Sequence, residues 1–243
     1  YNGGRGAALE GDPNASLSGF TALNNSLGGI FVTGGSLEGS DVNVTKSGGP
    51  GLQMLGGTLL NLTGFRAVDN AGAGAFVVGT ERVFLGLALV SNNSGQGIYL
   101  EGVQGAWLTG GGIERSTVFG LQALNTDVLS VDGTTFSGDA AGAIRVEGSG
   151  LFFLTNSSVT TGADHAVVVL GSTEATITDS LLAGLSAGLL ATDGVFVLVT
   201  NSSMDEPTVS LAAGVMIAWH VRVLVQDPLG YPAVGALVRV ANG

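Results

Sequence analysis

The sequence contains no cysteine, and charged residues make up only 11% of its 243 positions. The missing cysteine excludes disulfide bonds and thiolate metal sites, although a large domain needs neither in order to fold outside the cell. The charged fraction is well under the roughly 25% of an ordinary globular chain. We therefore expect a largely uncharged surface that is covered by partner subunits, by glycans or by both.

Positive charge is especially scarce. Lys46 is the one lysine, and the formal net charge is -11, which argues against nucleic acid and anionic membrane surfaces as partners. The most apolar stretch, residues 180–204, contains Asp193 and several Gly, Ser and Asn residues, so we interpret it as part of a repeat and not as a membrane span. The chain begins without methionine, which we interpret as a mature product whose signal peptide has been removed.

Glycine, in contrast, is abundant, with 42 residues. A glycine followed by a short apolar run recurs at intervals of about 23 residues, at Gly6, Gly29, Gly51, Gly74, Gly97, Gly120, Gly142, Gly188 and Gly214, with His165 in the place of a glycine. About ten residues later comes a second motif of six residues. Its first and last residues are apolar, its third is Asn, Asp or Gly, and its fourth is Ser or Thr, as in residues 131–136 and 177–182. Three short strands and three tight turns fit in one such period. Each coil then buries its apolar residues when neighbouring coils stack on it at about 4.8 Å.

This pattern resembles the right-handed parallel β-helix repeats of the pectate-lyase-like superfamily. It is most similar to the generic repeats of secreted and surface proteins, including the NosD-like group, and the resemblance covers about residues 6–218. It implies an all-β fold, a right-handed parallel β-helix solenoid of about nine coils that occupies residues 1–218. Leucine-rich repeats share the period range, but their consensus is absent.

The end of the chain follows a different pattern. Val221, Val223 and Val225 alternate with other residues, and a Pro-Gly turn follows at 227–230, which predicts a β-hairpin over 219–243. This segment resembles the start of carboxypeptidase regulatory-like and Ig-like modules. Two strands are marginally stable alone, so the hairpin packs on the open end of the β-helix, pairs with a neighbouring molecule, or begins a module that is truncated here.

Catalytic residues are not evident in the repeat. The expected outward positions of the first strand hold no pair of acidic residues: Gln53, Val77, Tyr99, Gln122, Arg145 and Val168. Glu101, Glu147 and Asp193 follow that strand in alternate coils, which places them about 10 Å apart, too far for a retaining glycosidase pair and at the margin for an inverting pair. We therefore predict solvated carboxylates and no catalysis, with a weak calcium site as the alternative.

Other site chemistries find little support. The two histidines, His165 and His220, are too few for a histidine metal cluster, and neither belongs to a Ser-His-Asp motif. We predict no metal-binding and no cofactor-binding residues. Four aromatic residues offer a sugar-stacking surface, but we interpret them as packing in the core or over a face: Tyr99, Trp107, Phe119 and Phe152.

Asn-x-Ser/Thr sequons are more frequent than composition explains, with seven present against about two by chance. They begin at Asn14, Asn24, Asn43, Asn61, Asn92, Asn156 and Asn201. An alternative explanation is a ladder of buried asparagines at the turns, with Asn156 and Asn201 at the same place in their coils. Asn24 and Asn92 come late in their coils, where a loop is expected, so we predict N-linked glycans there first and on Asn14 and Asn43 next.

These features predict a secreted, glycosylated structural protein without catalytic activity, a subunit of an extracellular filament, sheath or surface layer. The expected partners are glycans and further copies of the same chain, which join as a homopolymer through the coil ends and the 219–243 hairpin. One alternative is a carbohydrate-binding or carbohydrate-degrading β-helix protein. Another is a passive adhesin or spacer module of a longer surface protein.

Overall fold

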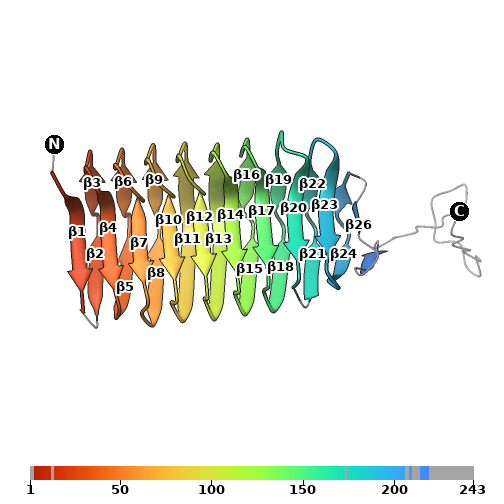
Figure 1. Ribbon diagram of the computed structural model, residues 1–243, viewed down its shortest axis with the longest axis horizontal. Helices are drawn as coiled ribbons and strands as arrows, with labels where there is room; N and C mark the ends of the chain where they lie inside the picture. Colours follow the sequence, from red (N-terminus) through yellow and green to blue (C-terminus); the bar gives the residue numbers. More distant parts are fainter. Residues whose placement is uncertain (1–2, 12–13, 173, 206–207, 210–213, 219–243) are drawn as a thin grey trace, which may run out of the picture.

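The computed structural model describes residues 3–11, 14–172, 174–205, 208–209 and 214–218. All regular structure in these residues is β-strand, wound into a parallel solenoid of about nine coils (Figure 1). The predicted β-helix is thus confirmed, and the predicted hairpin at 219–243 lies outside the described residues. No helix in the described part of the chain is long and apolar enough to cross a membrane.

One side of the solenoid is a ten-stranded parallel sheet. Each coil contributes one strand to it, in the order of the sequence: β1 (Arg5–Glu10), β4 (Gly28–Thr33), β7 (Leu52–Leu55), β10 (Ala75–Val78), β12 (Ile98–Glu101), β14 (Phe119–Leu124), β17 (Gly142–Glu147), β20 (His165–Leu170), β23 (Ala187–Thr192) and β26 (Thr208–Val209). We call this the first sheet.

The other two sides consist of the remaining strands. The second sheet contains β2 (Ala15–Ser18), β5 (Ser36–Ser40), β8 (Leu59–Thr63), β11 (Arg82–Ser91), β13 (Gly105–Glu114), β15 (Val128–Asp132), β18 (Leu151–Thr155), β21 (Glu174–Thr178), β24 (Phe196–Thr200) and β27 (Gly214–Ala218). The third contains β3 (Thr21–Leu23), β6 (Asn43–Thr45), β9 (Arg66–Val68), β16 (Thr135–Ser137), β19 (Ser158–Thr160), β22 (Leu181–Ala183) and β25 (Ser203–Met204). Strands β11 and β13 continue from the second sheet into the third.

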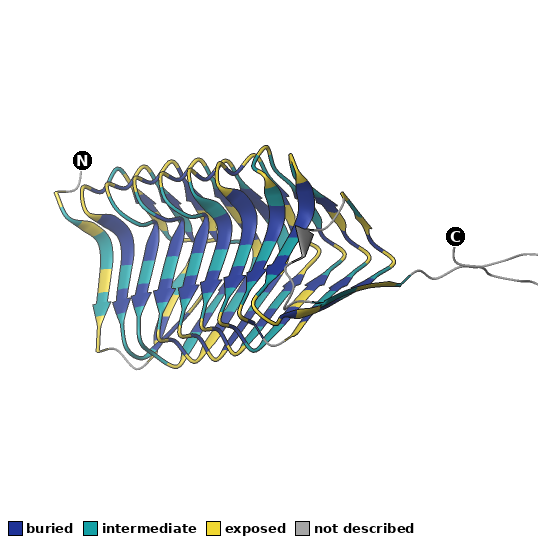
Figure 2. Cartoon of the chain, turned by 45° about the vertical axis from the view of Figure 1, so that its right-hand side comes forward, coloured by how far each residue is buried: buried dark blue, intermediate teal, exposed yellow. Residues whose placement is uncertain are grey.

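The core fills the centre of the solenoid because successive side chains of a strand point to opposite faces. In the first sheet, the inward residues of neighbouring coils align in register, and Ala75, Ile98, Leu121, Ile144 and Val167 are all fully buried. Figure 2 shows buried residues along the strands and exposed residues gathered at the corners. Whatever chemistry the protein performs therefore involves the outward positions.

The corners explain the recurring Gly, Asn and Asp residues. Most corners contain a residue with positive φ, a region that glycine, asparagine and aspartate enter at low cost. Examples are Asn125 at the first corner of its coil (φ 50), Asn156 at the second (φ 49) and Asn92 at the third (φ 55). Leu87, with φ 51, is a bulky exception at a second corner.

Glycine is also needed where each coil enters the first sheet, because the chain passes close to the third strand of the same coil. A Cβ added to Gly29 would lie 1.9 Å from Cγ1 of Val44. The register corrects two predicted positions, because Ala143 and Ala166, and not Gly142 and His165, align with Gly120. Alanine is small enough to replace glycine at these two positions, so the recurring glycines alone do not give the correct alignment of these two coils.

A third correction concerns the last repeat position. Gly214 lies in register with Phe196 of the second sheet, so it does not begin a further coil in the first sheet. The interval between Gly188 and Gly214 is longer than the other intervals of the repeat, and the register explains that departure.

Candidate functional site

The outer face of the first sheet carries two columns of outward residues. In register along the first column are Phe31, Gln53, Phe76, Tyr99, Gln122, Arg145, Val168 and Leu190. The second column contains Leu55, Val78, Glu101, Leu124, Glu147 and Leu170. The predicted outward positions are therefore correct except for one. Val77 is fully buried, and Phe76 faces outward in its place because it follows its coil's glycine by two residues, as Tyr99 does.

Two aromatic side chains stack within this column. The rings of Phe76 and Tyr99 lie over one another across neighbouring coils, with centroids 4.8 Å apart and planes 8° from parallel. The Tyr99 hydroxyl donates a hydrogen bond of 2.8 Å to Oε2 of Glu101 on the same strand. The stack and the hydrogen bond together hold the side chains of Tyr99 and Glu101 in one orientation on the sheet surface.

Amide and guanidinium groups continue the column over the next two coils. Nε2 of Gln96 donates a 2.9 Å hydrogen bond to Oε1 of Gln122. In the following coil, Nη2 of Arg145 lies 2.6 Å from Oε2 of Glu147, and the Arg145 guanidinium lies 5.7 Å from the centroid of the Phe119 ring. Each polar group thus has a partner that fixes its direction.

We call the outward residues of this region the polar face: Phe76, Tyr99, Glu101, Gln122, Arg145 and Glu147. Elsewhere the two outward columns of the first sheet carry mainly small or apolar side chains, among them Leu55, Val78, Val168, Leu170 and Leu190. The planar polar groups are therefore concentrated on β12, β14 and β17, near the middle of the solenoid.

The environment of Tyr99 determines its chemistry. Burial and the hydrogen bond and negative charge of Glu101 raise the pKa of Tyr99 from 10.0 to about 12. The phenol therefore stays protonated at neutral pH and acts as a hydrogen-bond donor. A tyrosinate base is not populated at this position.

The carboxylates of the polar face are separated as the repeat predicted. Glu101 and Glu147 both align with Leu124, which lies in the coil between them, so two coil spacings, about 10 Å, separate their backbones. Asp193 does not continue this column, because it occupies a corner with φ 59 and accepts a hydrogen bond from Thr192. Of the three predicted carboxylates, Glu101 and Glu147 therefore lie in the same outward column, and Asp193 does not.

The aromatic residues proposed as a sugar-stacking surface divide between outside and inside. Trp107 stacks on Phe84 on the outer face of the second sheet, with centroids 4.7 Å apart. Tyr99 and Phe119 lie on the outer face of the first sheet, and Phe152 is fully buried in the core. Of the four aromatic residues, only Phe152 therefore packs in the core.

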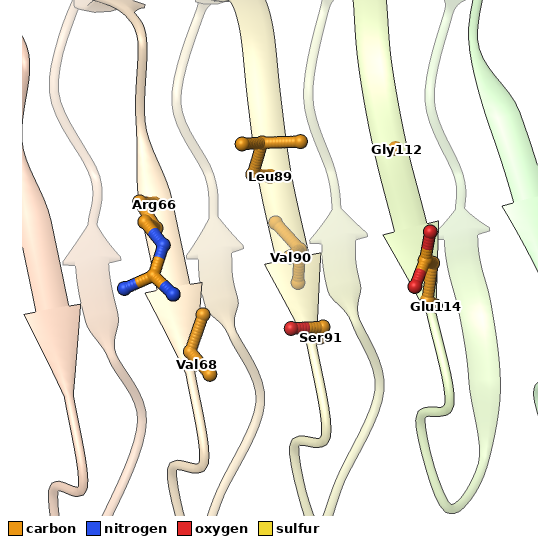
Figure 3. A pocket seen from close by; sticks show the side chains of 7 residues that line it. All are labelled: Arg66, Val68, Leu89, Val90, Ser91, Gly112 and Glu114. Atoms are coloured by element: carbon orange, nitrogen blue, oxygen red, sulfur yellow. The ribbon is translucent and has the colours of Figure 1, made fainter.

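A shallow hollow lies on the third side of the solenoid. Its volume is about 140 Å³, and seven residues line it: Arg66, Val68, Leu89, Val90, Ser91, Gly112 and Glu114. Figure 3 shows Arg66 and Glu114 on opposite sides of it, with Leu89 between them. Arg66 donates to Oδ1 of Asn43 at 3.4 Å, and Glu114 lies 3.6 Å from Arg115, so both charged groups contact neighbours on the protein surface.

The structure places the seven sequon asparagines at the surface. Asn14, Asn92, Asn156 and Asn201 are exposed, whereas Asn24, Asn43 and Asn61 are half-buried. The ladder interpretation of Asn156 and Asn201 is wrong. Each occupies a corner with positive φ, which turns the next residue inward, so Ser157 and Ser202 enter a buried serine ladder instead.

Buried asparagines form a ladder at another corner. Asn25, Asn70 and Asn93 are buried immediately after the third corner of their coils, and the same column continues with Ser116 and the buried carboxyl of Asp139. Burial raises the pKa of Asp139 from 3.8 to about 7, although hydrogen bonds from Ser116 oppose this shift. This acid is a structural element and does not reach the polar face.

His165 takes no part in the polar face. His165 begins β20 in a half-buried position, and His220 lies outside the described residues. No group of three or more His, Asp or Glu side chains in the described residues is arranged to hold a metal ion.

Comparison with known proteins identifies the fold. The family model described as "Right handed beta helix region" matches residues 50–204. No curated protein matches the sequence. Among solved structures, the chain is similar to the A-module of the mannuronan C-5 epimerase AlgE4 from Azotobacter vinelandii, with 14% identity, a TM-score of 0.59 and 83% of this chain covered. It spans 62% of that module's length.

The A-module of the mannuronan C-5 epimerase AlgE6 from the same organism is also similar, with 13% identity and a TM-score of 0.56, over 92% of this chain and 80% of that module. At these identities the two structures show a shared fold alone. The family model covers more than half of the chain, and the residues that it matches lie within the coils described above. The chain belongs to the right-handed β-helix region family.

Proposed function

We propose that this protein binds a neutral carbohydrate chain on the polar face, without transforming it. The observation that carries the proposal is the row of oriented planar groups from Tyr99 through Gln122 to Arg145. Carboxylate, amide and guanidinium groups pair with neighbouring hydroxyls of a sugar, and fixed partners lower the entropy cost of doing so. The similar solved structures are modules of carbohydrate-modifying enzymes, which supports a carbohydrate ligand.

Charge favours a neutral ligand over an anionic one. Among the described strands of the first sheet, the cationic side chains are those of Arg5 and Arg145, and Arg145 is already paired with Glu147. Glu101 leaves the polar face with net negative charge, and the whole chain carries -11. A polymer with one carboxylate per sugar would therefore be repelled.

Binding without catalysis is supported by the carboxylate geometry. The backbones of Glu101 and Glu147 are separated by about 10 Å along the solenoid, while a retaining pair needs about 5 Å and an inverting pair about 6.5 to 9.5 Å between the carboxyl groups. Each accepts a hydrogen bond from a partner two residues earlier on its own strand. The raised pKa of Tyr99 removes the remaining base on this face at neutral pH.

The test is a titration of neutral and uronic-acid oligosaccharides, followed by calorimetry on selected variants. We expect binding of one or more neutral oligosaccharides, weakened about tenfold or more by Tyr99→Ala or Gln122→Ala. The matched control is Trp107→Ala, which removes half of the other aromatic stack and leaves affinity unchanged. Equal loss in the control, preference for uronic-acid oligosaccharides, or no binding by any glycan would refute the proposal.

A structural role in an extracellular filament, sheath or surface layer is a second candidate. It is favoured by four sequon asparagines that are exposed on the solenoid, Asn14, Asn92, Asn156 and Asn201, because glycans on them would cover a surface that carries little charge. This role is compatible with carbohydrate binding on the polar face.

A further inference from the structure

The outer face of the second sheet is largely apolar from β8 to β24. In register along one outward column are Leu59, Arg82, Gly105, Val128, Leu151, Glu174 and Phe196. In register along the next are Asn61, Phe84, Trp107, Ser130, Phe153, Thr176 and Leu198. We call these two columns the apolar face. Their apolar side chains are half-buried or exposed, and contiguous apolar surface of this kind marks a contact site.

The aromatic stack on this face has a low profile. The rings of Phe84 and Trp107 lie 10° from parallel. A Cβ added to Gly105 would be 2.3 Å from a ring carbon of Trp107, so the glycine lets the indole lean along its own strand and close to the sheet. The face therefore remains level enough for a second sheet to pack on it at about 10 Å.

The two charged residues of the apolar face have opposite signs and lie symmetrically about its centre. Arg82 on β11 and Glu174 on β21 belong to the same column, and Val128 on β15 lies two strands from each. Both charged side chains are exposed, and neither has an ion pair or hydrogen bond within the described residues. A two-fold rotation about an axis along β15 would bring Arg82 of each copy opposite Glu174 of the other.

We propose that the apolar face pairs with the same face of a second copy of this chain, with the two solenoids antiparallel. The rotation that pairs the charges also places Trp107 opposite Phe153 of the second copy, which removes both rings from water. Val128 and Ser130 lie on the axis, each opposite its own equivalent, and their small side chains permit close approach. An isologous contact of this kind closes, so the product is a dimer.

The size of the apolar face fits a weak dimer. Its seven strands, at a spacing of about 4.8 Å, and about five residues per strand, at about 3.3 Å each, give a face of about 30 by 17 Å. Over two copies this is about 1,000 Å², the lower bound for a specific interface. Asp127 precedes β15 and Asp132 ends it, so both lie at the rim of the contact, where water screens their repulsion across the axis.

The test measures the association of the whole chain by sedimentation over roughly two orders of magnitude of protein concentration. Arg82→Glu and Glu174→Arg each place like charges at both contacts between the copies. The control for the first is Arg66→Glu, on the third sheet, and the control for the second is Glu10→Arg, on the first sheet. Circular dichroism verifies that each variant keeps its β-structure.

We expect a dimer for the parent chain and for both controls, and association about tenfold weaker or more in each of the two variants. An equimolar mixture of Arg82→Glu and Glu174→Arg should dimerise as tightly as the parent, because opposite charges then meet at both contacts. A parent chain that stays monomeric, as it would if a different protein covered this face, overturns the proposal. Dimers that persist in both variants, or a mixture that stays monomeric, overturn it as well.

Discussion

Asn70 donates a hydrogen bond of 3.0 Å from its side-chain amide to Oδ1 of Asn93, one coil further along the solenoid. Both side chains are buried, and Oδ1 of Asn93 also accepts the backbone N–H of Asn70 at 3.1 Å. The ladder thus satisfies polar groups that the tight third corner leaves inside the core.

Removing one member of this ladder should destabilise the fold. Asn93→Ala removes the acceptor of the Asn70 backbone N–H and of one hydrogen bond from the Asn70 side-chain amide; the amide keeps its hydrogen bond to the Val44 carbonyl. An unsatisfied buried polar group costs about 1 to 3 kcal/mol. The control is Asn92→Gly, which changes the exposed neighbour at the corner without a backbone penalty. Urea denaturation measures both free energies of unfolding, and a loss that is equal in the two variants would contradict the ladder's role.

Asp139 should make stability depend on pH. Its pKa is about 7 in the folded protein and 3.8 in an unfolded chain, so between these values the folded state holds a proton that the unfolded state has lost. Stability therefore falls as pH rises from about 4 to 7, by up to about 1.4 kcal/mol per pH unit. The negative charge of Glu114 contributes to this shift.

The variant Asp139→Asn should remove this dependence. An amide at this position keeps the acceptor for the backbone N–H of Ser116, which Asp139 binds at 2.8 Å, and never ionises. We expect the variant to be more stable than the parent at pH 8 and similar to it at pH 4, measured by denaturant melts. A constant difference between the two proteins across this range would show that Asp139 does not titrate with folding.

Leu87 should be a site of easy stabilisation. It adopts φ 51 at a corner, and its side chain is 62% exposed. The equivalent corners of the coils on either side are Gly64 and Gly110. Leu87→Gly relieves a conformation that costs a non-glycine residue about 1 kcal/mol, so the melting temperature should rise; an unchanged or lower value would mean that the leucine contributes contacts that offset its strain.

Glycosylation is expected first on Asn24 and Asn92. Asn92 is exposed and Asn24 half-buried, and both occupy third corners with φ 55, where a bulky glycan extends away from the solenoid. Glycopeptide mass spectrometry of the protein from its native source measures occupancy. Unmodified asparagine at both sites would remove the main support for an extracellular glycoprotein.

The sequence predicts the coil and its corners well because both depend on local chemistry. The nearly constant period of the repeat sets the strand stacking, and only Gly, Asn and Asp enter positive φ cheaply, so Asn125 and Asp193 mark corners by residue type alone. The resemblance to right-handed β-helices followed from these two signals.

The phase within a coil was harder to predict. Phe76 and Val77 are both apolar, so hydropathy does not show which one faces outward; the spacing of two residues from Gly74 does, and the register confirms it. Asn92 and Asn93 are chemically identical neighbours, yet one is exposed at a corner and the other buried in the ladder. The outward positions of Tyr99, Gln122 and Arg145 were predicted from the repeat. The hydrogen bonds that orient these side chains were not predicted, because they depend on side-chain geometry and, for Gln122, on a residue of the neighbouring coil.

Placing the ligand on the polar face tests the account most directly. The chain contains three tyrosines, Tyr1, Tyr99 and Tyr231, so protein labelled with 3-fluorotyrosine gives a simple fluorine NMR spectrum in which Tyr99→Phe assigns the Tyr99 resonance. We predict that titration with a bound neutral oligosaccharide shifts this resonance saturably and leaves the other two unchanged. Binding that saturates while the Tyr99 resonance stays fixed would contradict the account.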